Sequence, residues 1–226
     1  VEIISDSPVD CHAPALACAT DQAPLVVWSA ADGHVRSAFV PSICIPDLVP
    51  AGREIHDHGL GIHPCVASTW RGYIVVWAQG TRIIHQFAWP QPDPPDTLDV
   101  GVDLTDATLD VHGVTDAGSN VAWIAIGTPD GMVRFVRVTK GPTLDPVTLV
   151  SGLPEPGLPQ VTETPHWPDP LARVYYRRQG ESLAYRGEAD DGVWGDEVLV
   201  PEGWAIDNGF DAASALTGQQ TLLGLG

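Results

Sequence analysis

Acidic side chains recur at comparable positions along the chain, where a pair of them could do acid–base chemistry. Asp10, Asp110, Glu163 and Asp211 lie on or just before short segments that we predict to be the first strands of four repeats. Two carboxyl groups held about 5–9.5 Å apart can cleave a glycosidic bond. However, 29 residues are acidic, so such placements arise readily by chance. A glycoside hydrolase is therefore an alternative function, and we assign no catalytic residue.

Histidines offer a second possible chemistry. His12, His63 and His112 precede or begin predicted first strands at spacings of 51 and 49 residues, and His56 and His58 lie nearby. Three imidazoles that converge at one mouth of a ring would suit zinc or another borderline metal. The fourth and fifth repeats have no equivalent histidine, so each imidazole is better explained as a strand cap or a packing residue. We therefore predict no metal site and no cofactor.

Tryptophans in loops are the binding residues that we favour. Trp70 and Trp167 occupy corresponding loops of the second and fourth repeats, and Trp204 lies in the loop that enters the fifth. Exposed aromatic rings stack on sugars and on apolar partner surfaces, and Arg71 beside Trp70 would add hydrogen-bond donors. The alternative is that these indoles pack between neighbouring repeats as plugs. Three further tryptophans are predicted to belong to the core: Trp28, Trp77 and Trp123.

A repeat of about 49 residues must position all of these side chains. Val26, Val75, Ile124 and Val174 each stand in an apolar segment before a glycine-containing turn, and they are 49, 49 and 50 residues apart. A fixed period of this length is typical of solenoids, propellers and repeat arrays. No long stretch has the periodicity of a helix, and 21 prolines and 23 glycines are spread along the chain. The sequence therefore predicts an all-β repeat fold.

Each repeat is predicted to contain four short strands. The second strand is apolar at consecutive positions, as in LVVW at 25–28, which indicates burial on both faces. The third strand follows a turn with glycine, which supplies the positive φ that hairpins favour. Small residues in the first strand suit a crowded axis. First strands are expected at 14–20, 64–69, 111–115, 159–164 and 210–215, and outer strands at 147–150 and 198–200.

These strands predict a β-propeller of four-stranded blades that forms a single domain over residues 1–226. Residues 2–4 resemble an outer strand, and the last residues fall within a fifth repeat. If the N-terminal strand completes the last blade, a five-bladed ring is closed and no sheet edge is left open. We therefore expect residues 1–5 to pair with strands within 209–226. The alternative is that the chain is a piece of a longer propeller.

Charge and hydropathy exclude several partners. The formal charge of −18 opposes binding to nucleic acid, which requires basic patches. No apolar run approaches the roughly 18 residues that span a bilayer, so membrane insertion is not expected. The even number of cysteines (Cys11, Cys18, Cys44 and Cys65) permits two disulfides in an oxidising compartment, with their pairing left open. We expect an extracellular or surface-exposed protein.

Two segments resemble a repeat that is common in large secreted bacterial proteins. HPCVAS at 63–68 with GYIVVWA at 72–78, and PALA at 14–17 with LVVW at 25–28, are similar to its pattern of P-x-V-A followed by Y-L-V-V-W. The resemblance implies a propeller fold and a secreted protein. It assigns no activity, because the functions of such proteins are mostly uncharacterised.

A turn in the fourth repeat, DDGVW at 190–194, is similar to a degenerate Asp-box of sialidase-type propellers. The resemblance implies a folding element in which tryptophan packs under the turn, and it implies no activity. Sialidases also grip a carboxylate with three arginines from different blades, but their usual Arg-Ile-Pro start is missing, because Glu54 follows Arg53. Three third-strand arginines are instead expected to cover outer apolar surface: Arg36, Arg82 and Arg134.

The combined features favour a non-catalytic binding propeller that is lectin-like or serves surface recognition. Its expected partner is a glycan or a glycosylated surface, or else other protein subunits. Two alternatives stay open, namely a structural component of a cell-surface or virion appendage and a five-bladed glycoside hydrolase. Exposed loop indoles would favour the binding propeller. A large apolar outer face would favour the structural component, and two convergent axial carboxylates would favour the glycoside hydrolase.

Overall fold

A computed structural model describes the chain over thirteen ranges. These are residues 12–18, 23–40, 55–70, 72–88, 92–114, 120–140, 145–153, 156–164, 171–178, 182–190, 192–200, 210–214 and 220–224. Over these ranges the secondary structure consists of strands, and no helix there is long and apolar enough to cross a membrane. The all-β prediction is therefore confirmed for the described part of the chain.

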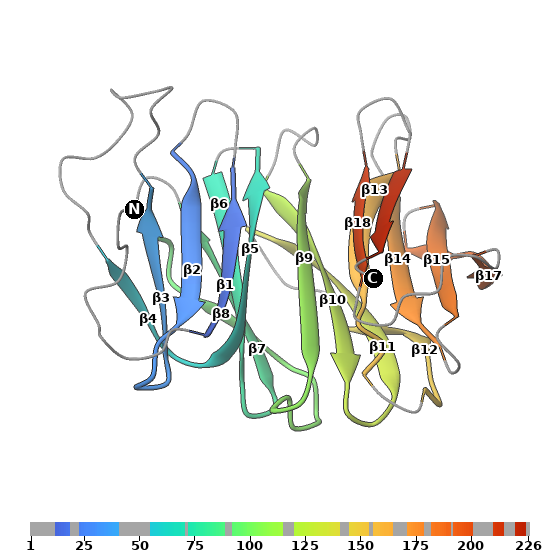
Figure 1. The fold of residues 1–226 in the computed structure, drawn as a ribbon, viewed down its shortest axis with the longest axis horizontal. Coiled ribbons are helices and arrows are strands. Elements are labelled where there is room, and N and C mark those ends of the chain that lie inside the picture. The colour runs from blue at the N-terminus through green and yellow to red at the C-terminus, as the bar shows by residue number, and fades with distance from the viewer. Residues whose placement is uncertain are drawn as a thin grey trace.

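The strands form five antiparallel sheets that follow one another along the chain (Figure 1). The first sheet contains β1 (His12–Ala17), β2 (Leu25–Ser29), β3 (His34–Phe39) and β4 (His56–Leu60). The second contains β5 (Ile62–Thr69), β6 (Gly72–Gln79), β7 (Arg82–Ala88) and β8 (Asp96–Asp99), and the third contains β9 (Thr108–Val114), β10 (Val121–Thr128), β11 (Met132–Thr139) and β12 (Val147–Val150). The fourth contains β13 (Gln160–Thr164), β14 (Leu171–Arg177), β15 (Leu183–Asp190), β16 (Val193–Trp194) and β17 (Val198–Leu199), and the fifth contains β18 (Phe210–Ser214) and β19 (Gln220–Gly224).

The strand register confirms the repeat. Each of the four anchor residues lies in a second strand and pairs with one residue of the first strand and one of the third. The pairs are Leu16–Val26–Ala38, Val66–Val75–Gln86, Val111–Ile124–Val136 and Val161–Val174–Arg186. Turns join the second and third strands in the same way, with positive φ at Gly33 (80°) and Gly131 (73°). A spacing of about 49 residues thus corresponds to one sheet.

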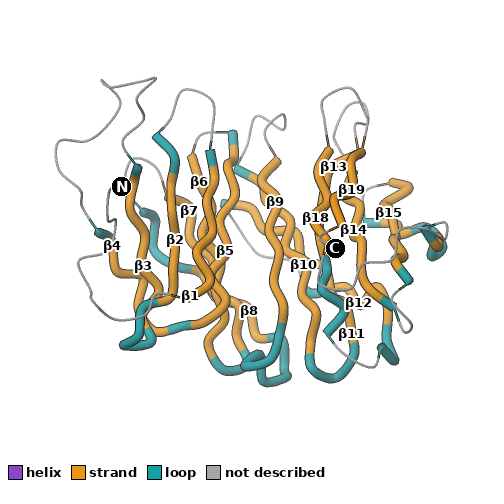
Figure 2. The backbone as a smooth tube through the Cα atoms, viewed as in Figure 1, coloured by secondary structure: helices purple, strands orange, loops and turns teal. Residues whose placement is uncertain are grey.

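The sheets stack face to face, with their first strands side by side. β1 contacts β5, β5 contacts β9, β9 contacts β13, and β13 contacts β18. Figure 2 shows the strands running between two ends of the stack, where turns and loops connect them. Face-to-face sheets pack about 10 Å apart and must interdigitate their side chains. The second and third sheets therefore each share a core with the sheet before and the sheet after.

Both faces of the inner sheets are buried, as the consecutive apolar residues predict. In β6, the odd-numbered residues from Tyr73 to Trp77 pack against the first sheet, whereas the even-numbered residues from Ile74 to Ala78 pack against the third. All six of these residues are at most 1% exposed. Burying one such large side chain contributes about 1.5–3 kcal/mol. The tryptophans that were predicted to be core are buried: Trp28, Trp77 and Trp123.

Specific contacts fix neighbouring sheets at close range. Tyr73 Oη donates a hydrogen bond to the carbonyl oxygen of Ala23 in the first sheet at 2.6 Å. Between β5 and β9 the backbones approach so closely that a Cβ atom on Gly113 would lie 1.7 Å from the oxygen of Ser68. Only glycine fits at that crossing, since any side chain would force the two sheets apart.

A buried ion pair joins the third and fourth sheets. Arg137 of β11 donates to both carboxylate oxygens of Glu188 on β15 at 3.1 Å. The Glu188 side chain is 1% exposed and also accepts hydrogen bonds from the backbone N–H groups of Ala172 (2.9 Å) and Gly192 (3.3 Å). The carboxylate thus pairs with Arg137 and also accepts a hydrogen bond from the turn that precedes Trp194. Trp194 in turn packs edge-on against Phe135 of the third sheet, with ring centroids 4.8 Å apart.

Some predictions about the ends and the cysteines have a different outcome. Sequence analysis located no outer strand in the first two repeats, where the structure has β4 and β8. Among the described residues no sheet closes on itself, and the fifth sheet has two strands. The predicted pairing of residues 1–5 lies outside the described residues.

Cys18 and Cys65 are free thiols, so two disulfides do not form.

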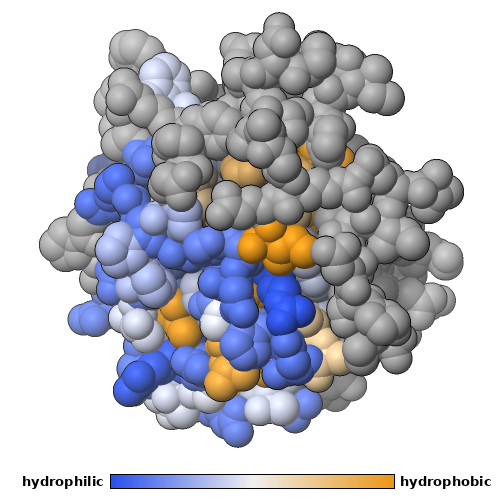
Figure 3. Space-filling view, turned by 90° about the vertical axis from the view of Figure 1, so that its left-hand side faces the viewer, coloured by the Kyte–Doolittle hydropathy of each residue, from blue (hydrophilic) through white to orange (hydrophobic). Residues whose placement is uncertain are grey.

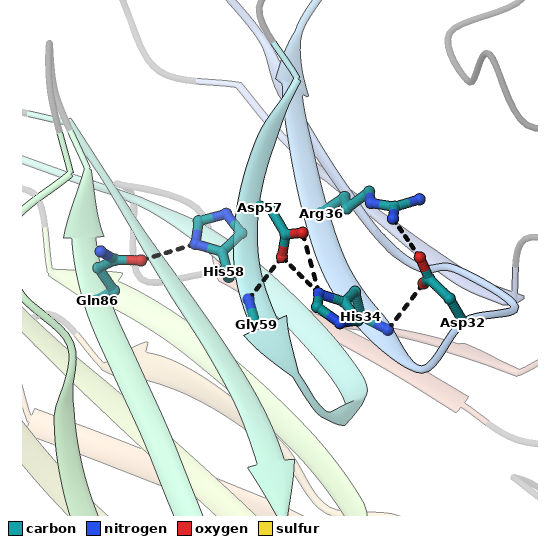
Figure 4. A network of polar contacts seen from close by, with 7 residues as sticks. All are labelled: Asp32, His34, Arg36, Asp57, His58, Gly59 and Gln86. Carbon is teal, nitrogen blue, oxygen red and sulfur yellow. Dashed lines mark hydrogen bonds and ion pairs between the residues drawn. The ribbon is translucent and has the colours of Figure 1, made fainter.

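A partly buried histidine also links the first two sheets, on the outer side of the stack (Figure 4). His58 Nδ1 lies 2.7 Å from Gln86 Oε1, and His58 Nε2 lies 2.8 Å from the Ser37 hydroxyl oxygen. An amide oxygen only accepts, so Nδ1 carries the proton and Nε2 accepts from Ser37. Burial lowers the pKa of His58 from 6.5 to about 4, and the imidazole is therefore neutral at pH 7.

We expect His58 to make the protein less stable in acid. The unfolded chain takes up this proton near pH 6.5 and the folded protein near pH 4, so the free energy of unfolding falls as pH drops between these values. The loss amounts to about 3 kcal/mol at its limit, at 1.36 kcal/mol for each pKa unit. Urea denaturation at several pH values measures it. The His58→Gln variant should show a shallower slope, and identical slopes in both proteins would contradict the assignment.

Breaking the buried ion pair should destabilise the stack strongly. In Glu188→Gln, Arg137 keeps its charge in a mostly buried position without a counter-charge, which costs about 3–5 kcal/mol. Urea denaturation monitored by tryptophan fluorescence measures the loss. As a control, Arg178→Gln removes the more exposed partner of the Arg178–Glu197 pair, whose side chains are 42% and 24% exposed. That control should cost at most about 1 kcal/mol. Equal losses in the two variants would contradict the role of burial.

Candidate functional site

A groove lies between the second and third sheets, at the end of the stack where their third strands finish. We call it the intersheet groove. Its volume is about 400 Å³, and its lining residues are His85, Phe87, Asp93, Pro94, Pro95, Asp96, Thr139 and Lys140. Six of them lie on β7, on the segment that follows it or at the start of β8, and two end β11 or follow it. The groove is thus assembled from two different repeats.

One wall of the intersheet groove is apolar. Phe87, near the end of β7, is 6% exposed and belongs to the core between the second and third sheets. Pro94 and Pro95 lie in the segment that leads from β7 to β8. Proline fixes φ, so this wall holds its shape at little further entropic cost. The wall therefore offers a preformed apolar surface to a ligand.

The opposite side of the groove is charged. Lys140 Nζ lies 2.8 Å from a carboxylate oxygen of Asp93, and both side chains are partly exposed, at 61% and 37%. Lys140 is the single lysine of a chain that has ten arginines. Asp96 adds a second carboxylate to the lining. This arrangement provides hydrogen-bond acceptors and one ammonium donor at the mouth of the groove.

Backbone and amide contacts hold the Asp93 segment in place. The Asp93 N–H donates to the carbonyl oxygen of Phe87 at 2.8 Å, and the Gln86 side-chain amide donates to the carbonyl oxygen of Asp93. Gln86 is the same residue whose amide oxygen accepts from His58. A continuous chain of polar contacts therefore runs from Ser37 of β3 to the rim of the groove.

His85 contributes a neutral imidazole to the lining. Its side chain is almost fully buried, and burial lowers its pKa, although the nearby Asp96 opposes the shift. A neutral imidazole has one donor nitrogen and one acceptor nitrogen. The ring therefore adds polarity to the groove without adding a positive charge.

A smaller cavity of about 20 Å³ adjoins the inner end of the groove and shares Phe87, Asp93 and Lys140 with it. We call it the inner cavity. It lies at the β5–β6 turn and the start of β10, and Thr69, Gly72, Tyr73 and Asn120 complete its lining together with Ala88. Register places all of these at one end of the stack: Thr69 pairs with Gly72, Tyr73 with Ala88, and Val121 with Thr139.

Trp70 stands on the turn beside the inner cavity. It follows Thr69 directly and is 49% exposed, so the structure does not make it a plug between sheets. Its role in binding stays a prediction. Arg71, Trp167 and Trp204, the other predicted binding residues, lie outside the described residues.

Two of the three repeat histidines, His63 and His112, make separate local contacts. His63 Nε2 lies 2.8 Å from the carbonyl oxygen of Thr105, whereas His112 stacks on Trp123 and has its Nε2 3.4 Å from Glu163. The side chain of His12 is not described. No group of three or more histidine, cysteine or acidic residues in the described ranges could hold a metal ion. His63 and His112 are therefore explained by local contacts.

The candidate carboxylates serve contacts between sheets. Asp110 of β9 accepts a hydrogen bond from the N–H of Val161 on β13 at 2.7 Å, and Glu163 is the partner of His112. Asp10 and the side chain of Asp211 lie outside what the structure describes. Neither Asp110 nor Glu163 lines the intersheet groove or the inner cavity. These contacts hold strands of neighbouring sheets together.

The third-strand arginines lie beside acidic residues. Arg36 pairs with Asp32, and Arg134 pairs with Asp130 at 3.0 Å, each within its own hairpin. Arg82 stands opposite Asp99 in the same sheet. The guanidinium groups of Arg36 and Arg134 thus neutralise carboxylates near the turns, and the covering of apolar surface by the arginine stems stays a prediction.

Sequence reasoning missed the intersheet groove. Neither the proline-rich stretch at 90–96 nor the single lysine, Lys140, belongs to a motif that marks a binding site in the sequence. A signal was present, because Asp93 and Lys140 follow the third strands of adjacent repeats and so lie at the same end of adjacent sheets. Opposite charges at such equivalent positions can meet across the boundary between two repeats.

Comparison by sequence finds no matching family model and no matching curated protein. Comparison of the structure does find similar solved structures. A mutant of the Aleuria aurantia lectin in complex with Fucα1-6GlcNAc superposes with a TM-score of 0.63 at 12% identity, over 95% of this chain and 72% of that one. A structure of this fungal lectin described as a six-bladed β-propeller gives a TM-score of 0.56 at 13% identity, over 89% of this chain and 67% of that one.

A third similar structure is a subtype N10 neuraminidase-like protein from a little yellow-shouldered bat isolate. Its TM-score is 0.54 at 10% identity, over 85% of this chain and 59% of that one. Identities this low carry information about the fold alone. Together with the stacked four-stranded sheets, they show that the chain has a β-propeller fold, in which each sheet is a blade.

Proposed function

We propose that this protein is a non-catalytic, lectin-like propeller that binds glycans in the intersheet groove. The groove itself carries the proposal, since it combines a volume of about 400 Å³ with an apolar wall and a charged side. Sites for small ligands are typically pockets of about 300–1,000 Å³ with mostly apolar walls and a few placed polar groups.

The chemistry of the groove matches that of a sugar ring, which has apolar C–H faces and hydroxyl groups around its edge. Phe87, Pro94 and Pro95 supply apolar surface for a C–H face. Asp93 accepts hydrogen bonds from hydroxyls, and Lys140 donates to them, so the pair can bridge neighbouring hydroxyl groups. The exposed indole of Trp70 lies on the adjacent turn and can extend the contact to a second sugar.

The structural likeness to lectins supports this proposal. Structures of the Aleuria aurantia lectin hold Fucα1-6GlcNAc and α-methyl-L-fucoside. The contacts of Asp110 and Glu163 favour binding over hydrolysis, because both carboxylates are engaged between sheets. We therefore place glycan binding ahead of a glycoside hydrolase.

The complete assembly that we propose is a five-bladed single domain in which residues 1–5 complete the fifth blade. The two described strands of that blade support this, since a two-stranded sheet would leave an edge open. An extracellular or surface-exposed location follows from a glycan target and from the resemblance of residues 63–78 to repeats of secreted bacterial proteins. The free thiols of Cys18 and Cys65 add no support for an oxidising compartment.

Removing either charged residue of the groove should weaken glycan binding. A glycan array identifies ligands, and isothermal titration then measures their affinity for the protein, for Lys140→Ala and for Asp93→Ala. A hydrogen bond to a charged group contributes about 1.5–3 kcal/mol, which corresponds to a loss of about 10-fold to 100-fold. Stability should change by less than about 1 kcal/mol, because the pair is exposed. The backbone contact of Asp93 with Gln86 survives both substitutions.

Asp130→Ala is the matched control. It breaks the Asp130–Arg134 pair at the opposite end of the third sheet and should leave affinity unchanged. Glycan binding that is insensitive to both groove variants would contradict the groove as the site. An array on which no glycan binds would contradict the proposed function itself.

A structural component of a larger assembly is a second candidate, and one observation favours it. Large apolar residues are exposed on the outer strands of the third and fourth sheets: Val147, Val193, Val198 and Leu199. Exposed apolar groups on outer strands are typical of association surfaces. Sedimentation over a range of concentrations tests this candidate. Self-association that Val198→Asp with Leu199→Asp abolishes would support it, whereas a monomer at all concentrations would count against it.

Figure 3 looks onto the β4 side of the molecule and shows a different surface. The described residues there are mostly hydrophilic, with hydrophobic residues in small separate patches. This side of the first sheet therefore does not offer a continuous apolar face among its described residues.

A further inference from the structure

We propose that the intersheet groove selects neutral sugars and that one sugar hydroxyl enters the inner cavity, between Thr69 and Asn120. This inference rests on the proposed function and narrows its ligand class. It comes from two polar atoms at the inner cavity and from the charges that line the groove.

The two polar atoms are Thr69 Oγ1 and Asn120 Oδ1. Thr69 is 3% exposed, and both atoms are buried. Within the described part of the chain neither atom has a hydrogen-bond partner. Buried polar atoms are nearly always paired in folded proteins, and those that are not need a specific explanation. Both residues line the inner cavity, which is where a partner for these atoms would lie.

The size of the inner cavity limits what can fill it. Its volume of about 20 Å³ is just above the roughly 10–15 Å³ that one water molecule requires. A hydroxyl group fits this space, whereas a sugar ring, a carboxylate or an acetamido group does not. The adjoining groove of about 400 Å³ has room for the ring that carries the hydroxyl.

Thr69 and Asn120 together have the polarity that a hydroxyl needs. The Thr69 hydroxyl can donate, and Asn120 Oδ1 can only accept. A sugar hydroxyl accepts one hydrogen bond and donates another, so a single group satisfies both atoms. A site built to pair with a hydroxyl discriminates strongly against a ligand that lacks it, because its buried polar atoms then stay unpaired.

Charge determines the class of sugar. Two carboxylates (Asp93 and Asp96) and one ammonium (Lys140) line the groove, and His85 is neutral because burial lowers its pKa. Lys140 already pairs with Asp93 at 2.8 Å. The formal charge of the whole chain is −18, which adds a repulsive field for anions. A sialic acid or uronic acid would therefore bring a third carboxylate to a negative groove, whereas a neutral sugar would not.

The key experiment replaces Thr69 by valine, which has nearly the same shape without the hydroxyl. Binding is measured by isothermal titration with four methyl glycosides: α-L-fucoside, β-D-galactoside, α-D-mannoside and the glycoside of N-acetylneuraminic acid. We expect one or more neutral glycosides to bind, and Thr69→Val to weaken that binding about 10-fold or more. Thr69→Ser keeps the hydroxyl and should stay within about threefold of the parent. The N-acetylneuraminic acid glycoside should bind most weakly to all three proteins.

Thermal unfolding of the ligand-free proteins separates this role from a structural one. A hydroxyl without a partner destabilises the empty protein, so Thr69→Val should leave Tm unchanged or raise it while affinity falls. If the inner cavity instead holds a structural water, Thr69→Val should lower Tm and leave affinity unchanged, which would overturn the proposal. Preference for the N-acetylneuraminic acid glycoside would overturn the assignment to neutral sugars.

The Lys140→Ala variant distinguishes failure of this inference from failure of the proposed function. Binding that Lys140→Ala weakens but Thr69→Val does not would keep the groove as the site and refute the inner cavity. Binding that neither variant affects would refute the groove, and with it both proposals.

Discussion

Burial of both faces of each inner sheet is the constraint on which the rest of this structure depends. A strand such as β6 must send alternate side chains into two different cores. The adjacent residues Tyr73 and Ile74, for example, lie in the cores on opposite faces of the second sheet. The sheets can therefore approach closely along their whole length, to the point where Gly113 leaves no room for a Cβ atom beside Ser68. In the described part of the chain, the intersheet groove and the inner cavity form where the strands end and the connecting segments separate the sheets.

The groove follows from that geometry. The stacked strands hold Phe87 and Thr139 at fixed positions, and the Asp93 segment and Lys140 meet just beyond them. Rigid strands that carry variable end segments are a general way to position binding residues. Residues within the stack bind one sheet to the next, as Asp110 and Glu188 do, while the polar lining of the groove lies at the end of the stack.

The fold could be predicted from the sequence to the extent that burial leaves a pattern. Consecutive apolar residues located the second strands, and a period of about 49 residues located their repeats. Strands β4 (HDHGL) and β8 (DTLD) left no such pattern, because an outer strand pairs on one edge and faces water, so polar residues suffice. The groove could not be predicted from the sequence for another reason. Asp93 and Lys140 are 47 residues apart and act together only once two sheets have stacked.

The single lysine has a practical meaning for any assay that attaches this protein to a support. Amine-reactive surfaces and dyes couple to lysine side chains and to the α-amino group. The single lysine of this sequence is Lys140, whose side chain is 61% exposed. Coupling there would place the linker at the mouth of the groove and remove the positive charge that faces Asp93. If glycans bind in the groove as proposed, a sensor prepared in this way would report an inactive protein although the protein in solution binds them. Attachment through an engineered tag leaves the mouth of the groove open to solution.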